Sequence, residues 1–190
     1  MSSEDNRPRG HLYHEGYEEK SESIDGGTAF RVKYVYTGNY FKPMMSEKRF
    51  ILHKIMNVLF ALVSFGLQII AGTSRLLLNS LFFVNIFQTF SLLASILSLA
   101  GVIYYATKPQ KMEIHYYKRF HKQFPWAYFA SWMSTVCIII CSIIGLILFK
   151  ERQIGQYIPF FIMNAVSCIL MFVVWITEKN MQYAAVLPDN

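Results

Sequence analysis

The chain has 190 residues, of which 54 % are hydrophobic and only 16 % are charged, and its formal net charge is +6. Soluble domains average roughly 25 % charged residues, so this composition excludes an ordinary soluble globular protein and predicts a membrane protein. The basic residues lie at the boundaries of a few apolar runs and no recognition motif accompanies them, so the positive charge does not indicate nucleic-acid binding.

The first 28 residues are acidic and poor in aliphatic side chains. They include seven Asp and Glu residues but only three Lys and Arg residues. A segment of this composition cannot bury enough apolar surface to offset the entropy that it loses on ordering. We therefore predict that residues 1–28 form a disordered tail.

Residues 29–54 form a juxtamembrane segment with a different pattern. Aromatic and apolar side chains alternate with other residues, and this period of two predicts a short extended strand. The alternating side chains are Phe30, Val32, Tyr34 and Tyr36. Gly38 and Asn39 are typical of a two-residue turn, although Pro43 would truncate a return strand. An isolated hairpin is marginal in water, so it would need support from the membrane surface, the central loop or a second protomer.

Four apolar runs without Asp, Glu, Lys or Arg follow along the chain. They lie at about residues 55–71, 83–106, 126–149 and 157–176. Runs of about 17–25 apolar residues cross a bilayer as helices, because hydrocarbon offers no water to pair with their backbone. We therefore predict an all-α integral membrane protein, a four-helix transmembrane bundle over residues 55–176, with a short tail at residues 177–190.

Lys and Arg residues are distributed unevenly between the two sides of this predicted bundle. Eleven flank one side and three flank the other. Because short cytoplasmic loops carry the excess of Lys and Arg, we predict a multi-pass cell-membrane protein with both termini and the central loop in the cytoplasm. The eleven are Lys33, Lys42, Lys48, Arg49, Lys54, Lys108, Lys111, Lys118, Arg119, Lys122 and Lys179, and the three are Arg75, Lys150 and Arg152.

The loop between the second and third runs has an amphipathic pattern. Apolar side chains recur every four residues opposite a basic side, which predicts an amphipathic helix in the headgroup plane. The apolar set is Met112, Tyr116, Phe120 and Phe124, and the candidate lipid-binding residues are Lys108, Lys111, Lys118, Arg119 and Lys122. Each basic residue near an anionic leaflet contributes roughly 1 kcal/mol, so membrane lipids are expected ligands. The alternative is a connector packed under the bundle, whose charges serve only as a topology signal.

Small and polar residues recur at spacings of three or four along each predicted helix. Helices in lipid associate through close packing at such residues and through hydrogen bonds, so we expect these seams to face one another. The seams are Asn57, Ala61, Ser64, Gln68 and Gly72; Asn85, Gln88, Ser91, Ser95 and Ser98; Ala127, Ser131, Ser134, Cys137, Cys141 and Gly145; and Asn164 and Cys168.

Four amide side chains in these seams fall toward the outer leaflet in the predicted topology. They are Gln68, Asn85, Gln88 and Asn164. One hypothesis is that they form a polar vestibule for a neutral solute or a lipid headgroup. The alternative is that they are satisfied amides that hold the bundle together.

The sequence has no signature of catalysis or of a bound cofactor. The four runs lack both ionisable residues typical of ion-coupled transport and histidines that could bind haem. His115 and His121 lack a third ligand for zinc. Cys137, Cys141 and Cys168 all lie inside the third and fourth runs, which excludes a disulfide framework in the loops. We therefore predict neither an enzyme, a cofactor nor a metal site.

These observations predict a non-enzymatic structural, assembly or accessory subunit whose cytoplasmic loop holds anionic lipid or a partner. The alternative is a small oligomeric permease or channel subunit for an uncharged solute, with the amide cluster lining its path. A third hypothesis is a membrane enzyme that holds a phosphorylated lipid on its basic loop. A membrane-protein partner or a homo-oligomer is compatible with the first two hypotheses.

Overall fold

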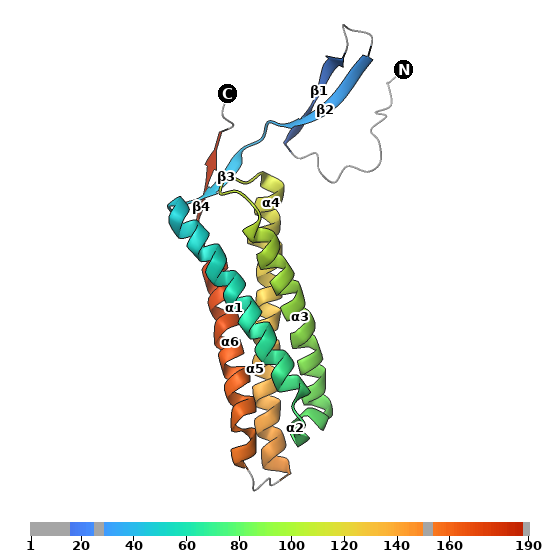
Figure 1. The fold of residues 1–190 in the computed structure, drawn as a ribbon, viewed down its shortest axis with the longest axis vertical. Helices are drawn as coiled ribbons and strands as arrows, with labels where there is room; N and C mark the ends of the chain where they lie inside the picture. Colours follow the sequence, from blue (N-terminus) through green and yellow to red (C-terminus); the bar gives the residue numbers. More distant parts are fainter. Residues whose placement is uncertain (1–15, 25–28, 150–153, 188–190) are drawn as a thin grey trace, which may run out of the picture.

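The computed structural model describes residues 16–24, 29–149 and 154–187. Four long helices lie side by side, and short strands gather at one end of them (Figure 1). The long helices are α1 (Glu47–Thr73), α3 (Phe82–Ala106), α5 (Phe124–Leu148) and α6 (Ile158–Lys179). The shorter helical segments are α2 (Leu77–Ser80), α4 (Ile114–Lys118), η2 (Arg119–Gln123) and η3 (Ile154–Tyr157). The strands are β1 (Tyr17–Ile24), β2 (Ala29–Tyr36), β3 (Tyr40–Pro43) and β4 (Tyr183–Val186).

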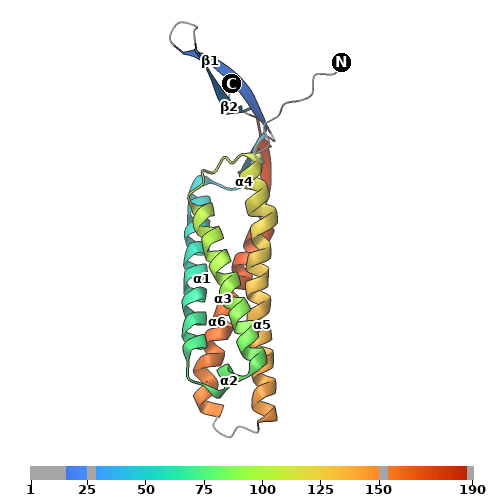
Figure 2. The ribbon, with the colours of Figure 1, turned by 90° about the vertical axis from the view of Figure 1, so that its right-hand side faces the viewer.

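All four long helices are apolar enough and long enough to cross a membrane, which supports a transmembrane character for the chain. Each coincides with one of the four predicted apolar runs, so that part of the prediction is confirmed. α1 packs on α3 and α6, and α5 packs on the same two helices, which closes a four-membered ring. We call the end that carries the strands the terminal end, and the end that carries α2 the turn end (Figure 2).

The central connection is a helix that runs straight into α5. α4, the π-helical turn η2 and α5 form one continuous helical stretch from Ile114 to Leu148. We predicted an amphipathic helix lying in the headgroup plane, and this orientation is wrong: the segment stands on top of α5 as its extension (Figure 2). The wider turn explains why Pro125 does not break the helix, because the Phe124 N–H reaches back five residues to the Arg119 carbonyl.

The apolar side of this connection packs on the bundle instead of facing outward. Met112 and Phe120 are buried together with Phe50 of α1 and Tyr105 of α3. The Tyr105 hydroxyl lies 3.1 Å from the hydroxyl of Tyr183. Burial, helped by the nearby Glu178 carboxylate, raises the pKa of the Tyr183 phenol, so this hydroxyl stays protonated. The aromatic side chains thus form a plug that closes the terminal end.

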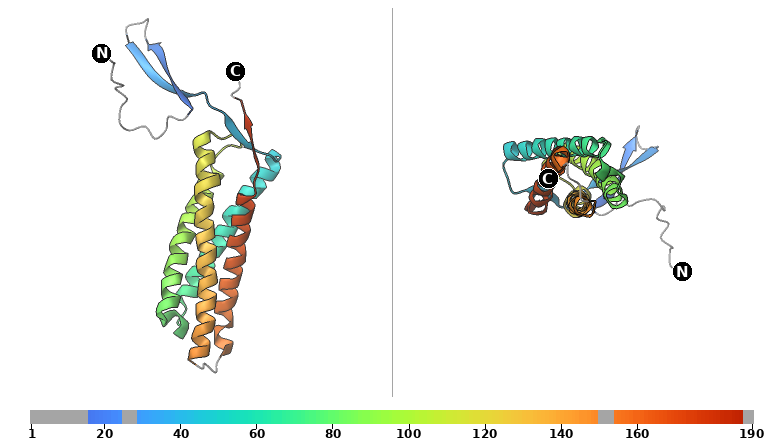
Figure 3. Two further views of the ribbon diagram at one scale, coloured as in Figure 1. Left: turned by 180° about the vertical axis from the view of Figure 1, so that it is seen from behind. Right: turned by 90° about the horizontal axis from the view of Figure 1, so that it is seen from below.

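The N-terminal segment differs from our prediction of disorder through residue 28. β1 pairs antiparallel with β2, with Glu22 opposite Arg31 in the register, and this hairpin projects from the terminal end (Figures 1 and 3). Composition alone did not indicate β1, because its sequence is polar and offers little apolar surface to bury. Its backbone N–H and C=O groups find their partners in β2 instead. The Tyr17 hydroxyl donates a hydrogen bond to the Glu113 carboxylate, which ties the hairpin to the connection. Residues 1–15 and 25–28 of the predicted tail lie outside the described residues.

β3 pairs with a strand from the far end of the chain. It lies antiparallel to β4, with Phe41 opposite Ala185, in place of the local return strand that the Gly38–Asn39 turn would have made. The other edge of β3 meets the connection, because the Phe41 N–H donates to the Met112 carbonyl at 2.7 Å and the Met112 N–H donates back at 2.9 Å. These bonds join both terminal segments and the central connection into one cap.

Gly101 lets the backbone of α3 lie close to the Phe124 ring at the start of α5. A Cβ atom at Gly101 would lie 2.7 Å from Cδ1 of the Phe124 ring, whereas a Cβ atom at Gly66 would meet nothing within 4 Å. We expect Gly101→Ala to lower the free energy of unfolding by about 1–3 kcal/mol through overpacking. We expect Gly66→Ala to leave it unchanged or to raise it by up to about 1 kcal/mol through helix propensity. Thermal unfolding in detergent micelles measures both, and equal effects would contradict the close approach.

Candidate functional site

A hydrogen-bonded network crosses the middle of the bundle, and its hub is the Gln68 side chain of α1. The Gln68 Oε1 atom accepts a hydrogen bond of 2.9 Å from the Ser95 hydroxyl of α3. Its Nε2 atom donates to the Ser167 hydroxyl of α6 at 3.0 Å and to the Thr135 hydroxyl of α5 at 3.3 Å. One amide therefore contacts all three of the other long helices.

Three further hydroxyl pairs extend the network from this hub. The Ser95 and Ser131 hydroxyls lie 2.7 Å apart, the Ser91 and Thr135 hydroxyls 3.0 Å apart, and the Ser64 and Ser167 hydroxyls 2.7 Å apart. All seven side chains of this network are buried. We name it the Gln68 network; its members are Ser64, Gln68, Ser91, Ser95, Ser131, Thr135 and Ser167. A polar group in hydrocarbon without a partner costs several kcal/mol, so each member satisfies another.

The spacing of four residues predicted most of this inward-facing surface. Asn57, Ala61, Ser64 and Gln68 of α1 are all buried, as expected of a seam. In α5 the predicted seam is only partly correct, since the buried stripe continues from Ser131 through Thr135, Ile138 and Ser142 to Gly145. Ser134, Cys137 and Cys141 lie beside this stripe and are only partly buried. The Ser134 hydroxyl donates to the Ala130 carbonyl of its own helix at 2.8 Å.

The structure separates the four amides that were expected to cluster. Gln68 is the hub described above, while Asn85 is exposed. The Asn164 Nδ2 atom donates to the Phe160 carbonyl of its own helix at 2.9 Å. The Gln88 Nε2 atom is buried without a hydrogen-bond partner, beside the position where Gly72 would carry a Cβ. Within the described part of the chain, no hydrogen bond joins any two of these four amides.

A second polar cluster lies at the terminal end, between α1 and α6. The Glu178 carboxylate is buried, and its Oε1 atom lies 2.8 Å from His53 Nε2 and accepts a hydrogen bond of 2.5 Å from Asn57 Nδ2. His53 and Asn57 share one face of α1 because they are four residues apart. The sequence placed His53 and Glu178 only at the edges of separate runs, and the four-residue spacing of His53 and Asn57 was the available signal for this cluster.

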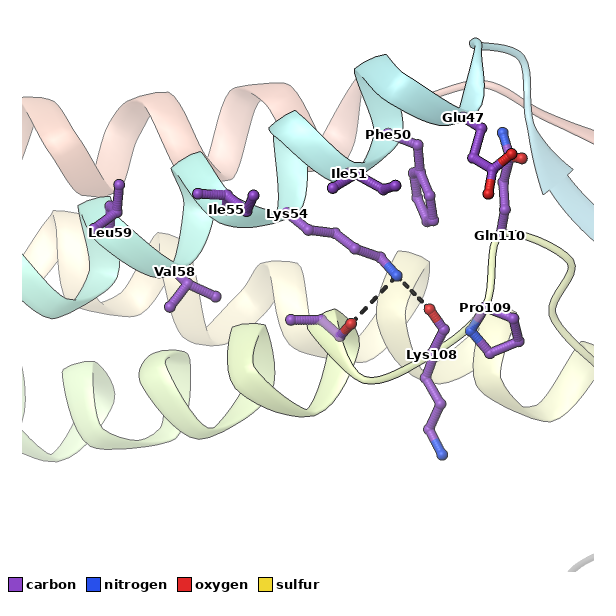
Figure 4. A pocket seen from close by; sticks show the side chains of 11 residues that line it. Glu47, Phe50, Ile51, Lys54, Ile55, Val58, Leu59, Lys108, Pro109 and Gln110 are labelled. Carbon is purple, nitrogen blue, oxygen red and sulfur yellow. Dashed lines mark hydrogen bonds between the residues drawn. The ribbon is translucent and has the colours of Figure 1, made fainter.

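A groove of about 480 Å³ separates the start of α1 from the end of α3 (Figure 4). The Lys54 side chain crosses this groove, and its ammonium donates to the carbonyl of Lys108 and to that of Ala106, at 3.5 Å for the latter. These carbonyls lie at the C-terminus of α3, where a helix lacks backbone partners and favours positive charge. Lys54 therefore caps α3, and the carboxylate of Glu47 lines the same groove.

Three of the five candidate lipid-binding residues pack on aromatic rings. Lys108 Nζ lies 4.0 Å from the centre of the Tyr116 ring, and Lys111 Nζ lies 4.7 Å from that of Tyr40. The Arg119 guanidinium lies 5.9 Å from the Tyr104 ring centre. Of the other two, Lys118 is partly buried, whereas Lys122 is exposed and borders a groove between α5 and α6. Lys108 and Arg119 therefore share the Tyr104 ring, whereas Lys111 packs on Tyr40 and Lys122 borders the groove between α5 and α6.

No group of three or more His, Cys, Asp and Glu side chains that could hold a metal ion occurs among the described residues. Cys137, Cys141 and Cys168 are free thiols. Protein-family models, curated proteins and solved structures gave no match to this chain. The function must therefore be inferred from the geometry of this molecule.

Replacement of the hub should weaken the bundle far more than the same change at a second glutamine. Gln68→Leu removes the three hydrogen bonds that the amide makes to Ser95, Thr135 and Ser167, and bonds of this kind average about 0.6 kcal/mol in membrane bundles, so we expect a loss of about 2 kcal/mol. Gln88→Leu removes a buried donor that has no partner, so we expect no loss or a small gain. Unfolding followed by tryptophan fluorescence in detergent compares the two variants, and a larger loss for Gln88→Leu would refute the hub.

Proposed function

We propose that the protein is a non-enzymatic, multi-pass membrane protein that acts as a structural or accessory subunit and holds anionic lipid at its terminal end. The observation that carries this proposal is the position of the basic residues. The start of α1 and the end of α6 bring Lys48, Arg49 and Lys179 to the terminal end, where η2 adds Lys122 and the rest of the central connection adds further basic residues. At the turn end, Arg75 is the only Lys or Arg among the described residues.

The charge distribution also supports an orientation with the terminal end in the cytoplasm. Inner leaflets carry anionic lipid, and short loops rich in Lys and Arg remain on that side of the membrane. The acidic residues at the terminal end offset this charge only in part. Glu178 is buried against His53 and Asn57, and Glu113 accepts the hydrogen bond from Tyr17. Glu47 is exposed beside Lys48 and Arg49, but the exposed basic residues near the ends of the long helices outnumber it: Lys48, Arg49, Lys122 and Lys179.

The interior of the bundle favours a scaffold over a permease. A solute path needs polar side chains that remain free to exchange partners with the solute. Both hydrogens of the Gln68 amide are already directed at Thr135 and Ser167, and its oxygen accepts from Ser95. The same bonds tie all four long helices together and provide a rigid base for the cap that β3, β4 and the connection form.

The orientation predicts opposite labelling of the two ends. In a variant whose three native cysteines are replaced by serine, we expect Ser80→Cys at the turn end to react with a membrane-impermeant maleimide on intact cells. Gln123→Cys at the terminal end should react only after the cells are opened; both positions are exposed. Labelling of Gln123→Cys from outside intact cells would reverse the proposed orientation.

Lipid retention tests the proposed function directly. We expect the purified chain, reconstituted in nanodiscs of equal parts phosphatidylglycerol and phosphatidylcholine, to retain the anionic lipid preferentially when native mass spectrometry releases it. A single lysine close to an anionic headgroup contributes roughly 1 kcal/mol, which predicts an enrichment of about fivefold or more at low salt. The enrichment should fall as added salt shortens the Debye length. Equal retention of the two lipids would refute the proposal.

A further inference from the structure

We propose that the groove between α5 and α6 at the terminal end is a binding site for the headgroup of an anionic phospholipid. This inference rests on the proposed function and names the site that would perform it. The groove has a volume of about 470 Å³. Two lysines, Lys122 and Lys179, line it together with the rings of Trp126, Phe129 and Trp175.

The two helices present the same arrangement of side chains to this groove. Lys122 precedes Trp126 by four residues at the start of α5, and Lys179 follows Trp175 by four residues at the end of α6. Since α5 leaves the terminal end and α6 returns to it, each lysine lies about one helical turn, roughly 6 Å, outside its tryptophan. Tryptophan concentrates at the boundary between headgroups and hydrocarbon, so both lysines lie at the level of lipid phosphates.

The charge of the groove suits an anion. Lys122 and Lys179 are both exposed, and no described Asp or Glu lines the groove. Glu178 adjoins Lys179 in sequence, but its carboxylate is buried toward His53 and Asn57 of α1. His121, which also lines the groove, is held by a stacked contact with Tyr117 at a ring-centre distance of 5.3 Å. Two lysines thus line one groove without a competing carboxylate.

The walls of the groove suit the acyl part of a lipid. Phe129 contacts Trp126 and Trp175, with ring centres 6.0 and 5.3 Å apart. Trp175 stacks on Trp132 at 5.7 Å, and Phe172 contacts both of these rings. Trp126 is 71 % exposed and Phe172 is 38 % exposed, so apolar surface continues from the headgroup level toward the middle of the bundle. A phosphate between the lysines would leave the acyl chains along this surface.

The groove between α1 and α3 lacks these properties. Its Lys54 ammonium is already bonded to the carbonyls of Ala106 and Lys108, and Glu47 adds a negative charge to the lining. By contrast, Lys122 and Lys179 make no hydrogen bond to any other described residue. The ammonium of Lys179 lies 5.0 Å from the Trp175 ring centre. The α5–α6 groove therefore has cations that can donate to a phosphate.

Tryptophan quenching tests this site because all three tryptophans of the chain, Trp126, Trp132 and Trp175, lie in or beside the groove. The full chain is reconstituted in phosphatidylcholine containing an equal mole fraction of either brominated phosphatidylglycerol or brominated phosphatidylcholine. We expect the anionic lipid to quench with an apparent affinity roughly fivefold to thirtyfold higher, as one or two lysines contribute. Added salt should reduce this preference.

Matched variants distinguish this groove from general surface charge. Lys122→Gln combined with Lys179→Gln should abolish the preference, and the corresponding pair of arginine substitutions should restore it. Lys20→Gln combined with Lys42→Gln removes the same charge from exposed positions outside the groove and should keep the preference. The arginine pair and the salt series on the wild-type chain keep the test decisive if the glutamine pair folds poorly.

The outcomes separate this inference from the proposed function. If the wild-type chain retains anionic lipid in mass spectrometry but the glutamine pair at Lys122 and Lys179 quenches as the wild type does, the groove is not the site and the proposed function stands. Equal loss in the pair at Lys20 and Lys42 would also overturn the groove, because the effect would then be one of net charge. If the wild-type chain retains no excess of anionic lipid, the proposed function fails as well.

Discussion

The requirement that every polar group in an apolar medium must find a partner inside the protein governs this molecule. Hydrocarbon offers no hydrogen bonds, so a buried amide or hydroxyl is costly unless the protein supplies its partner. The Gln68 side chain meets this requirement at the middle of the bundle by bonding to Ser95, Thr135 and Ser167 on the three other long helices. A rotation of any one helix about its axis would break at least one of these bonds. The network therefore fixes which face of each helix points inward and, by the same step, which face points outward.

The terminal end shows the same rule applied to charge. Glu178 and Lys54 are both buried at this level, yet they do not pair with each other. Glu178 accepts from Asn57 and lies beside His53, whereas Lys54 caps the carbonyls at the end of α3. Each charge is thus compensated by groups that also join two helices. Two rings of the aromatic plug, Phe50 and Tyr105, lie beside the Lys54 ammonium, and the bonds between β3, β4 and Met112 join the strands to the connection.

The parts of this fold that could be predicted from sequence are those that depend on local pattern. The four long helices follow from uncharged runs, and the inward face of α1 and the part of the α3 face from Ser91 to Ser98 follow from spacings of three or four between small and polar residues. Asn85, which belongs to the same predicted seam of α3, is exposed. In α5 the same spacing fits two neighbouring stripes, through Ser134 and Cys137 or through Thr135 and Ile138. A sequence pattern could not choose between them, because the choice depends on which hydroxyl Gln68 and Ser91 reach from other helices.

Pairings between distant segments were beyond the sequence for a related reason. β3 and β4 lie more than 130 residues apart in the chain, and neither strand has an alternation that identifies its partner. The His53–Glu178 contact likewise joins the first long helix to the last. The amphipathic connection was recognised from its spacing, but its apolar side fitted a membrane surface and a protein surface equally well. The aromatic residues at the end of α3, Tyr104 and Tyr105, decided in favour of the protein surface because both pack on Phe120.

The partners of each ammonium group distinguish basic residues that stabilise the fold from those that remain free to bind a ligand. An ammonium group has three hydrogens and no acceptor, so each carbonyl or ring that it already serves leaves less for a ligand. Lys54 serves two carbonyls, and Lys108 lies over two aromatic rings. Lys122 and Lys179 remain exposed on the outward side of helices whose inward faces are fixed by the Gln68 network. The position of these two lysines above a tryptophan each is thus a consequence of the packing in the middle of the bundle. A ligand bound there would contact both helices, so its binding would depend on the rotation of α5 relative to α6.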